Sequence, residues 1–265
     1  VRRPLIDRYL EDKMNTETKE LISKVPHVTL LFWIIKIFAT TLGETGGDAL
    51  SMSLDLGYLL STGIFALIFI AAVTVQIKAT KFHPYLYWLT IVATTTVGTT
   101  LADYATRDMG IGYTGGSAIL LTCVVISLVV WRWVMGTVAV ESVSTAKAEV
   151  FYWVTIMFSQ TLGTALGDWF ADSLDLGYLV AAAVFGTALL ITYLLYRFTN
   201  ASRVLLFWVA FILTRPLGAV VGDFLDKPLD HGGLNLSRFT ASAVLLVLIV
   251  AFIYIFPQKP AETAH

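Results

Sequence analysis

Four aspartates stand at a fixed distance from four tryptophans, and they are the residues of this chain best suited to chemistry. The tryptophans are Trp33, Trp88, Trp153 and Trp208, and fifteen residues after them stand Asp48, Asp103, Asp168 and Asp223. A carboxylate in an apolar helix costs about 2.5–3.5 kcal/mol to insert into a membrane, so it normally faces a partner, water or an ion. Four copies of such a residue indicate a site that binds cations or carries protons.

More polar residues share a helical ridge with these aspartates. Counted from each Trp, positions 3, 7, 11 and 15 are four apart, which places them on one side of a helix. Besides the aspartates, the ridges carry Glu44, Lys36, Arg215, Thr40, Thr95, Thr99, Gln160 and Thr164. We expect the four aspartates and Glu44 to bind a substrate or ion, and the other ridge residues to support them.

The ridges are rich in acids. Five negative charges, from Glu44 and the four aspartates, stand against two positive charges, from Lys36 and Arg215, and they sum to −3. Either some of these acids are protonated or the cluster attracts a cation. Carboxylate oxygens with Thr and Gln groups suit Mn²⁺ or Mg²⁺ better than copper. We expect Asp48, Glu44 and Asp168 to be metal ligands. In a structural alternative, each aspartate ends its helix and bonds backbone amides of the following turn.

The composition indicates an integral membrane protein. The 265 residues are 57% hydrophobic and 14% charged, which is too apolar for a soluble domain of this size. A net charge of −1 gives no reason to expect nucleic acid, and the single cysteine, Cys123, allows no disulfide within the chain. The sequence has neither a metal-binding histidine spacing nor a nucleophile pattern, so we expect no enzyme and no cofactor.

Eight apolar stretches are long enough to cross a bilayer, and each Trp–Asp repeat contains two of them. They cover residues 28–50, 57–77, 85–106, 113–135, 150–171, 177–196, 203–225 and 237–256. Because each repeat holds an even number of spans, all four enter the membrane in the same direction, and any pseudosymmetry axis lies along the membrane normal. The predicted fold is all-α, a polytopic membrane protein of four tandem two-helix repeats.

The repeats also pair into two halves. Successive tryptophans are 55, 65 and 55 residues apart, so repeats 1 and 3 are 120 residues apart, as are repeats 2 and 4. Residues 53–58 and 173–178 have the same sequence. We therefore expect two pseudo-symmetric halves, 27–140 and 141–256, with an N-terminal segment 1–26 and a C-terminal tail 257–265.

The basic residues predict an orientation. Thirteen of the eighteen Lys and Arg lie in the two tails and near the connections between repeats. By the positive-inside rule, both termini are cytoplasmic and the turns within repeats face outward. We expect the outer group Asp226, Lys227, Asp230 and His231 to form a solvated turn.

Small residues and one proline predict how the helices pack. Glycines placed beside the aspartates let helices approach closely. They are Gly43, Gly47, Gly98, Gly163, Gly167, Gly218 and Gly222. In repeat 4, Pro216 follows Arg215, so we expect that helix to kink or unwind at the level of the ridge.

The pattern of Trp, Gly, Asp and then Gly-Tyr, in four tandem copies of two spans each, resembles a bacterial inner-membrane family. This family is known as a tandem repeat of unknown function and is often labelled an uncharacterised membrane-anchored protein. The resemblance covers about residues 28–256 and implies eight spans in a bacterial inner membrane, but no activity or ligand. Repeat 4 departs from the pattern, because Gly233 stands where the others have Tyr58, Tyr113 and Tyr178.

Three functions fit these observations. The leading hypothesis is a small secondary transporter that moves a metal or other small cation against protons. The first alternative is a non-transporting membrane scaffold or regulatory partner, in which the aspartates are structural. The second is an exporter of small organic solutes. The expected partners are the lipid bilayer and a small cation or proton, and the sequence is compatible with an oligomer.

Overall fold

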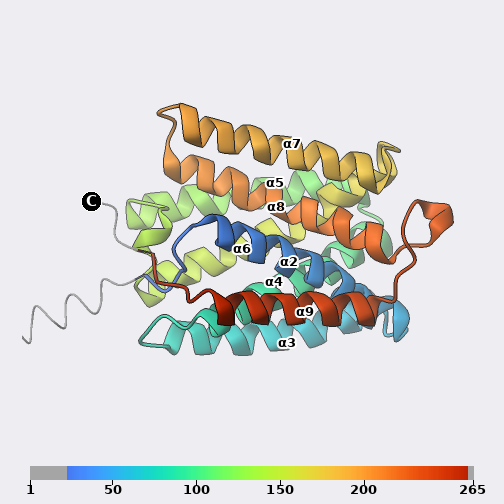
Figure 1. Cartoon of the computed structure of the whole chain (residues 1–265), viewed down its shortest axis with the longest axis horizontal. Coiled ribbons are helices and arrows are strands. Elements are labelled where there is room, and N and C mark those ends of the chain that lie inside the picture. Colours follow the sequence, from blue (N-terminus) through green and yellow to red (C-terminus); the bar gives the residue numbers. More distant parts are fainter. Residues whose placement is uncertain (1–22, 262–265) are drawn as a thin grey trace, which may run out of the picture.

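The computed structural model describes residues 23–261, and this part of the chain forms eight long α-helices that run along one common direction (Figure 1). The helices are α2 (Leu30–Asp48), α3 (Gly57–Lys78), α4 (Pro84–Asp103), α5 (Gly112–Met135), α6 (Ala146–Asp168), α7 (Gly177–Phe198), α8 (Arg203–Asp226) and α9 (Arg238–Ile255). The all-α class is confirmed. Of the two segments expected to be cytoplasmic, 1–26 and 257–265, residues 1–22 and 262–265 lie outside the described part of the chain.

Four helices form an inner ring, and they are the four that carry the Trp–Asp pattern. Helices α2 and α6 each pack against both α4 and α8. The ring order is therefore α2, α4, α6, α8 and back to α2. In the first three of these helices, the repeated aspartate is the last α-helical residue.

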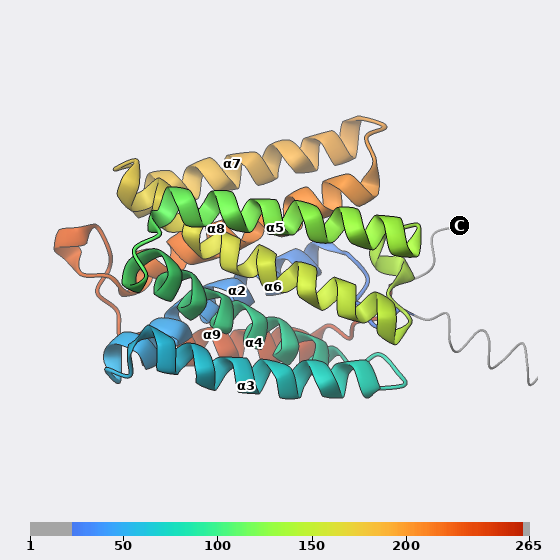
Figure 2. The ribbon, with the colours of Figure 1, turned by 180° about the vertical axis from the view of Figure 1, so that it is seen from behind.

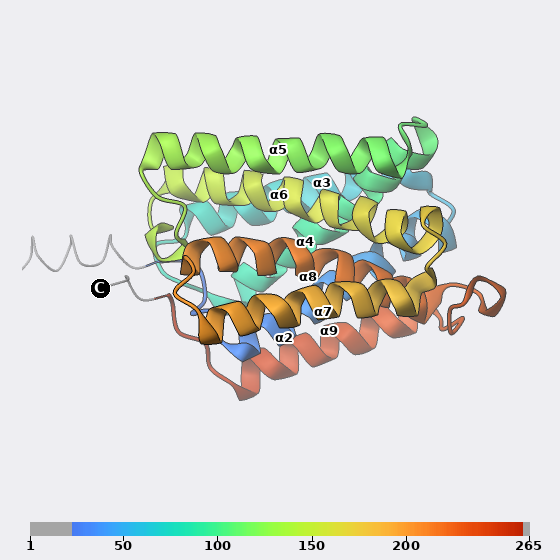
Figure 3. The ribbon, with the colours of Figure 1, turned by 90° about the horizontal axis from the view of Figure 1, so that it is seen from above.

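The other four helices cover the ring, and each packs mainly on the inner helix of the next repeat (Figures 2 and 3). Helix α3 lies on α4, α5 lies on α6, and α7 lies on α8. The last helix, α9, lies on α2 of the first repeat, which closes the cycle. The four repeats are thus related by an approximate rotation about the ring axis. The division into halves 27–140 and 141–256 stays a prediction.

The connections lie at two opposite ends of the bundle (Figure 1). One end, called the turn end below, holds residues 54–56, 109–111, 174–176 and 227–237. The other end, called the terminal end, holds residues 79–83, 136–145 and 199–202 together with the start of α2 and the end of α9. There the Val25 carbonyl accepts a hydrogen bond from the Ala261 N–H at 2.8 Å, and the His27 N–H donates to the Lys259 carbonyl at 2.8 Å.

Helix surfaces identify a multi-pass membrane protein. Among the described residues, five helices are long and apolar enough to cross a membrane: α3, α5, α7, α8 and α9. The outer helices expose apolar side chains, such as Leu67 at 71% and Val247 at 66%, which suit contact with lipid. The inner helices α2, α4 and α6 do not meet the same criterion because polar ridge residues interrupt their apolar runs.

The backbone conformation at the turn end explains why a glycine recurs nine residues after each aspartate. Gly57, Gly112, Gly177 and Gly232 have φ angles between 69° and 81°, in the left-handed region that favours glycine.

In the first three repeats, the aspartate is followed by a single π-helical stretch, at Ala49–Ser53, Tyr104–Asp108 and Trp169–Ser173. In repeat 4, α8 continues past Pro216 to Asp226 as one helix, so the expected unwinding at Arg215–Pro216 is wrong.

Candidate functional site: a buried polar column

The four ridges meet inside the ring as a column of stacked layers, called the polar column below. From the terminal end, its layers are Lys36, Ile91, Ile156 and Phe211; Thr40, Thr95, Gln160 and Arg215; Glu44, Thr99, Thr164 and Ala219; and Asp48, Asp103, Asp168 and Asp223. Each of these side chains is buried, with at most 2% of the residue exposed. The layer nearest the terminal end is thus apolar except for Lys36, and the other three layers are polar except for Ala219.

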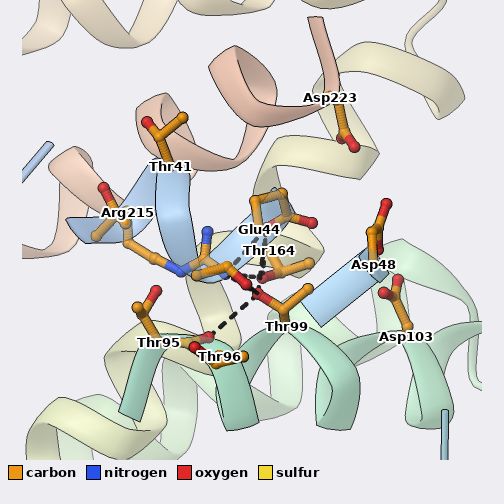
Figure 4. Close-up of polar contacts among 12 residues, drawn as sticks. Thr41, Glu44, Asp48, Thr95, Thr96, Thr99, Asp103, Thr164, Arg215 and Asp223 are labelled. Atoms are coloured by element: carbon orange, nitrogen blue, oxygen red, sulfur yellow. Dashed lines mark hydrogen bonds and ion pairs between the residues drawn. The ribbon is translucent and has the colours of Figure 1, made fainter. Parts of the chain in front are cut away.

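Arg215 extends into this column toward Glu44, Thr99 and Thr164 (Figure 4). Its Nη2 donates hydrogen bonds to Glu44 Oε2 at 3.0 Å, to Thr99 Oγ1 at 2.6 Å and to Thr164 Oγ1 at 2.5 Å. These three partners come from α2, α4 and α6, so one nitrogen of α8 connects all four inner helices. Because Arg215 is fully buried, its charge depends on Glu44 for compensation.

The predicted glycines lie at the contacts between successive inner helices. A Cβ added at Gly163 would overlap the side chain of Arg215, and one added at Gly43 would overlap Thr95. The same relation holds one layer nearer the turn end, where a Cβ at Gly222 would lie 2.7 Å from Glu44 Cβ. The remaining glycines of the set are Gly47, Gly98, Gly167 and Gly218, which face Thr99, Gln160, Ala219 and Thr40 of the next repeat. Glycine therefore provides the space that the column side chains occupy.

Two basic residues join the four aspartates in pairs. Arg107 Nε lies 3.0 Å from Asp103 Oδ1, and its Nη2 lies 3.1 Å from Asp168 Oδ2. Lys227 Nζ lies 3.1 Å from Asp223 Oδ1 and also contacts Asp48 Oδ2. In both pairs, the base follows its own aspartate by four residues and reaches the aspartate of the next repeat.

The sequence-based interpretation missed the roles of these two bases. Lys227 was expected in a solvated turn, but its side chain is only 12% exposed, so that expectation is wrong. Burial would lower the pKa of Lys227, but the nearby Asp223, Asp48 and Asp226 outweigh this and hold its pKa well above its usual range. The sequence does carry a signal for these roles, because repeats 2 and 4 each have a base four residues after the aspartate, which is the spacing of a helical ion pair.

The two bases also change the charge of the column. With Arg107 and Lys227 included, five acids stand against four bases, so the formal sum becomes −1 instead of −3. Arg107 has two further neighbours, because its Nη1 donates to the Tyr58 hydroxyl at 3.2 Å and it lies 5.7 Å from the Tyr113 ring centroid. The aspartate layer is therefore largely compensated by the chain itself.

Among residues 23–261, the carboxylates gather into two trios that share Asp48. One trio is Glu44, Asp48 and Asp103, and the other is Asp48, Asp223 and Asp226; within each, the oxygens lie within 4.8 Å of one another. Asp168, which the sequence suggested as a metal ligand, belongs to neither trio. Asp48 Oδ1 is buried and has no hydrogen-bond partner among residues 23–261. The first trio can offer one oxygen from each of three carboxylates to a hard cation.

The structural alternative for the aspartates required hydrogen bonds to the amides of the next turn. In the described part of the chain, no capping hydrogen bond comes from the side chains of Asp48, Asp103 or Asp168. All three instead point into the column and contact bases or other acids. Their burial therefore does not follow from fixing the turns.

The terminal end of the column is closed by aromatic side chains. The residues just before the four tryptophans are Phe32, Tyr87, Tyr152 and Phe207, and the hydroxyls of Tyr87 and Tyr152 are 2.6 Å apart. The tryptophans themselves are buried, because Trp88, Trp153 and Trp208 are at most 3% exposed. They pack in one core cluster together with side chains of the outer helices α3, α5 and α9.

These features define a multi-pass helical membrane protein with four repeats around a buried polar column. The chain matches the Repeat of Unknown Function (DUF347) four times, at residues 31–82, 86–137, 151–202 and 206–258, and it belongs to this family. The expected family and its four tandem repeats are thus confirmed. No curated protein and no solved structure matches the chain.

Proposed function

We propose that the protein is a small secondary transporter that moves a metal or other small cation against protons through the polar column. The observation that carries this proposal is the trio Glu44, Asp48 and Asp103, whose buried oxygens lie within 4.8 Å of one another. Three such oxygens suit Mn²⁺ or Mg²⁺, since both ions prefer carboxylate ligands. The same carboxylates can carry protons when the cation leaves.

Lys227 suggests how cation binding is balanced. Its ammonium group contacts Asp48 and Asp223, which are two of the three carboxylates of the second trio. A bound cation near Asp48 would compete with this internal positive charge for the same oxygens. In this mechanism, release of Lys227 from Asp48 accompanies cation binding, and its return helps to expel the cation.

The proposal includes eight spans in a bacterial inner membrane, with the terminal end in the cytoplasm. Helices α2, α4 and α6 have about the same length as the five apolar helices and lie among them. We assign the cytoplasm to the terminal end because most of the Lys and Arg among residues 23–261 belong to this end. The charges inside the ring then face the column rather than lipid. We propose no enzymatic activity.

A non-transporting scaffold is the second candidate, and the ion pairs favour it. Arg107 and Lys227 each join two aspartates, and Arg215 is paired with Glu44, so most of the charges are compensated without a ligand. Such a network can fix the arrangement of four repeats without any transport. The transporter and the scaffold differ in whether a cation binds to the protein and changes its stability.

The deciding experiment compares Asp48→Asn with Asp55→Asn, the same chemical change at an exposed turn residue whose φ of 55° asparagine tolerates. Thermal melts in detergent with Mn²⁺, Mg²⁺, Zn²⁺ and Na⁺ would be combined with ion flux into proteoliposomes. We expect a saturable metal-dependent rise in melting temperature and proton-driven flux for the wild type and Asp55→Asn, and neither for folded Asp48→Asn. A well-folded wild-type protein with no ion-dependent shift and no flux would favour the scaffold.

A further inference from the structure

The layers of the column nearest the terminal end contain buried hydrogen-bond donors without partners. They are Lys36 Nζ, Gln160 Nε2, Thr95 Oγ1 and the Nε and Nη1 atoms of Arg215, which, like the acceptor Gln160 Oε1, have no hydrogen-bond partner among residues 23–261. Their side chains belong to residues that are 0% exposed and that come from all four inner helices. Buried donors normally have partners, so several in two adjacent layers indicate a missing acceptor.

The charge of these layers identifies the kind of acceptor. Lys36 and Arg215 are the two bases of these layers, while the acids of the column lie nearer the turn end. Glu44 contacts only one nitrogen of Arg215, and Asp48 is twelve residues from Lys36, about 18 Å along the helix. Lys36 Nζ lies 3.8 Å from the centre of the Phe211 ring, which attracts the charge but accepts no strong hydrogen bond. An anion would therefore complement the two bases of these layers.

We propose that the polar column binds a small monovalent anion, such as chloride, between Lys36 and Arg215. Lys36 Nζ, Gln160 Nε2 and the free guanidinium N–H groups of Arg215 would donate to it. Water could accept the same hydrogen bonds, but it would leave two buried cations sharing one acid. The apolar side chains of Ile91, Ile156 and Phe211 fill the rest of the layer that holds Lys36, which restricts the site to a small ion.

This site goes beyond the proposed cation transport, since it has the opposite charge and lies in different layers. The carboxylate trio gathers around Asp48 near the turn end, whereas the donors are centred on Lys36 and Arg215 (Figure 4 shows Arg215 and Asp48 well apart). Chloride binding does not require metal binding. The two proposals can therefore fail separately.

The test uses the purified full chain in detergent, with sodium chloride replacing sodium gluconate at constant ionic strength and pH. We expect saturable binding of about one labelled chloride per chain by equilibrium dialysis, and a matching rise in melting temperature. Lys36→Met removes a charged hydrogen bond and should weaken binding by roughly 10- to 100-fold. Lys36→Arg should keep most of the affinity. Lys81→Met, the same change at an exposed lysine, should bind like the wild type.

Two results would overturn the proposal: no saturable chloride binding by the wild type, or unchanged binding by Lys36→Met. If Lys36→Met does not fold, Gln160→Met removes another donor from the site and should weaken binding in the same direction. Asp48→Asn separates this proposal from the proposed function, because it should lose its response to Mn²⁺ and still bind chloride. Chloride binding that disappears in Asp48→Asn but persists in Lys36→Met would place the anion elsewhere and refute the assignment.

Discussion

Glu44 and Arg215 are 171 residues apart in the chain, yet Glu44 Oε2 and Arg215 Nη2 lie 3.0 Å apart inside the inner ring. The pair joins the first repeat to the fourth. The same nitrogen binds Thr99 and Thr164 of the two repeats between them. Both charges are buried, so water cannot take the place of either partner when that partner is removed.

The Glu44–Arg215 pair predicts that substitutions of its two members have strongly non-additive effects on the free energy of unfolding. Glu44→Gln and Arg215→Met should each lower the free energy of unfolding by about 3–5 kcal/mol, because each leaves one buried charge without its partner. The double variant should lose much less than the sum of the two. Reversible unfolding in mixed detergent micelles measures all four proteins. Additive losses would show that the two side chains act independently.

The two bases of the aspartate layer should have equivalent effects. Lys227→Met and Arg107→Met each leave two aspartates without their shared base. Both bases are partly exposed, so we expect losses of about 1–3 kcal/mol, smaller than for a fully buried pair. Lys81→Met, at an exposed position, should change stability by less than about 0.5 kcal/mol. Wild-type stability of Lys227→Met in thermal melts would rule out a compensating role for this residue.

Two mid-helix glycines should respond in opposite ways to alanine. At Gly163 an added Cβ would overlap the Arg215 side chain, whereas at Gly186 of α7 it would meet nothing within 4 Å. Gly163→Ala should therefore cost about 1–3 kcal/mol. Gly186→Ala should be neutral or stabilising by up to about 1 kcal/mol, because glycine is a poor helix former. Thermal melts of the two variants compare them directly, and equal effects would contradict the packing described at Gly163.

Cysteine labelling tests the orientation. In a Cys123→Ala background, an impermeant maleimide should label Ser53→Cys in intact cells, because residue 53 is exposed at the turn end. Lys81→Cys, which is exposed at the terminal end, should react only after permeabilisation. The opposite pattern would place the termini outside the cytoplasm.

The repeat pattern predicted much of the fold. The eight apolar stretches correspond to the eight helices of residues 23–261, because a bilayer-length apolar run has few alternatives to a helix. The ridge positions shared by the four repeats also place Asp48 and Glu44 in one column, since residues four apart lie on one side of a helix. Periodicity thus predicted which side chains point inward.

Periodicity did not predict which repeats would touch. That α3 packs on α4 of the next repeat, and that Arg107 reaches Asp168, depends on the rotation between repeats, which no spacing encodes. Lys227 was misjudged because a charged residue after a helix is usually solvated, and its burial results from the approach of Asp48, 179 residues earlier. The trio with Asp103 instead of Asp168 has the same origin, because neighbouring repeats meet more closely than opposite ones.

Because α9 packs on α2, the cycle of repeats is closed, and no repeat is structurally marked as the first. The backbone at residue 25 is hydrogen-bonded to residue 261, so the two ends of the described chain already lie side by side. A circular permutant that begins at residue 141, with residues 261 and 23 joined by a short linker, would keep every contact between inner helices. We expect such a permutant to insert and to melt within a few degrees of the natural order. The order of repeats along the gene would then be separable from the assembled ring, and fragments cut in the 136–145 connection should reassemble when they are co-expressed.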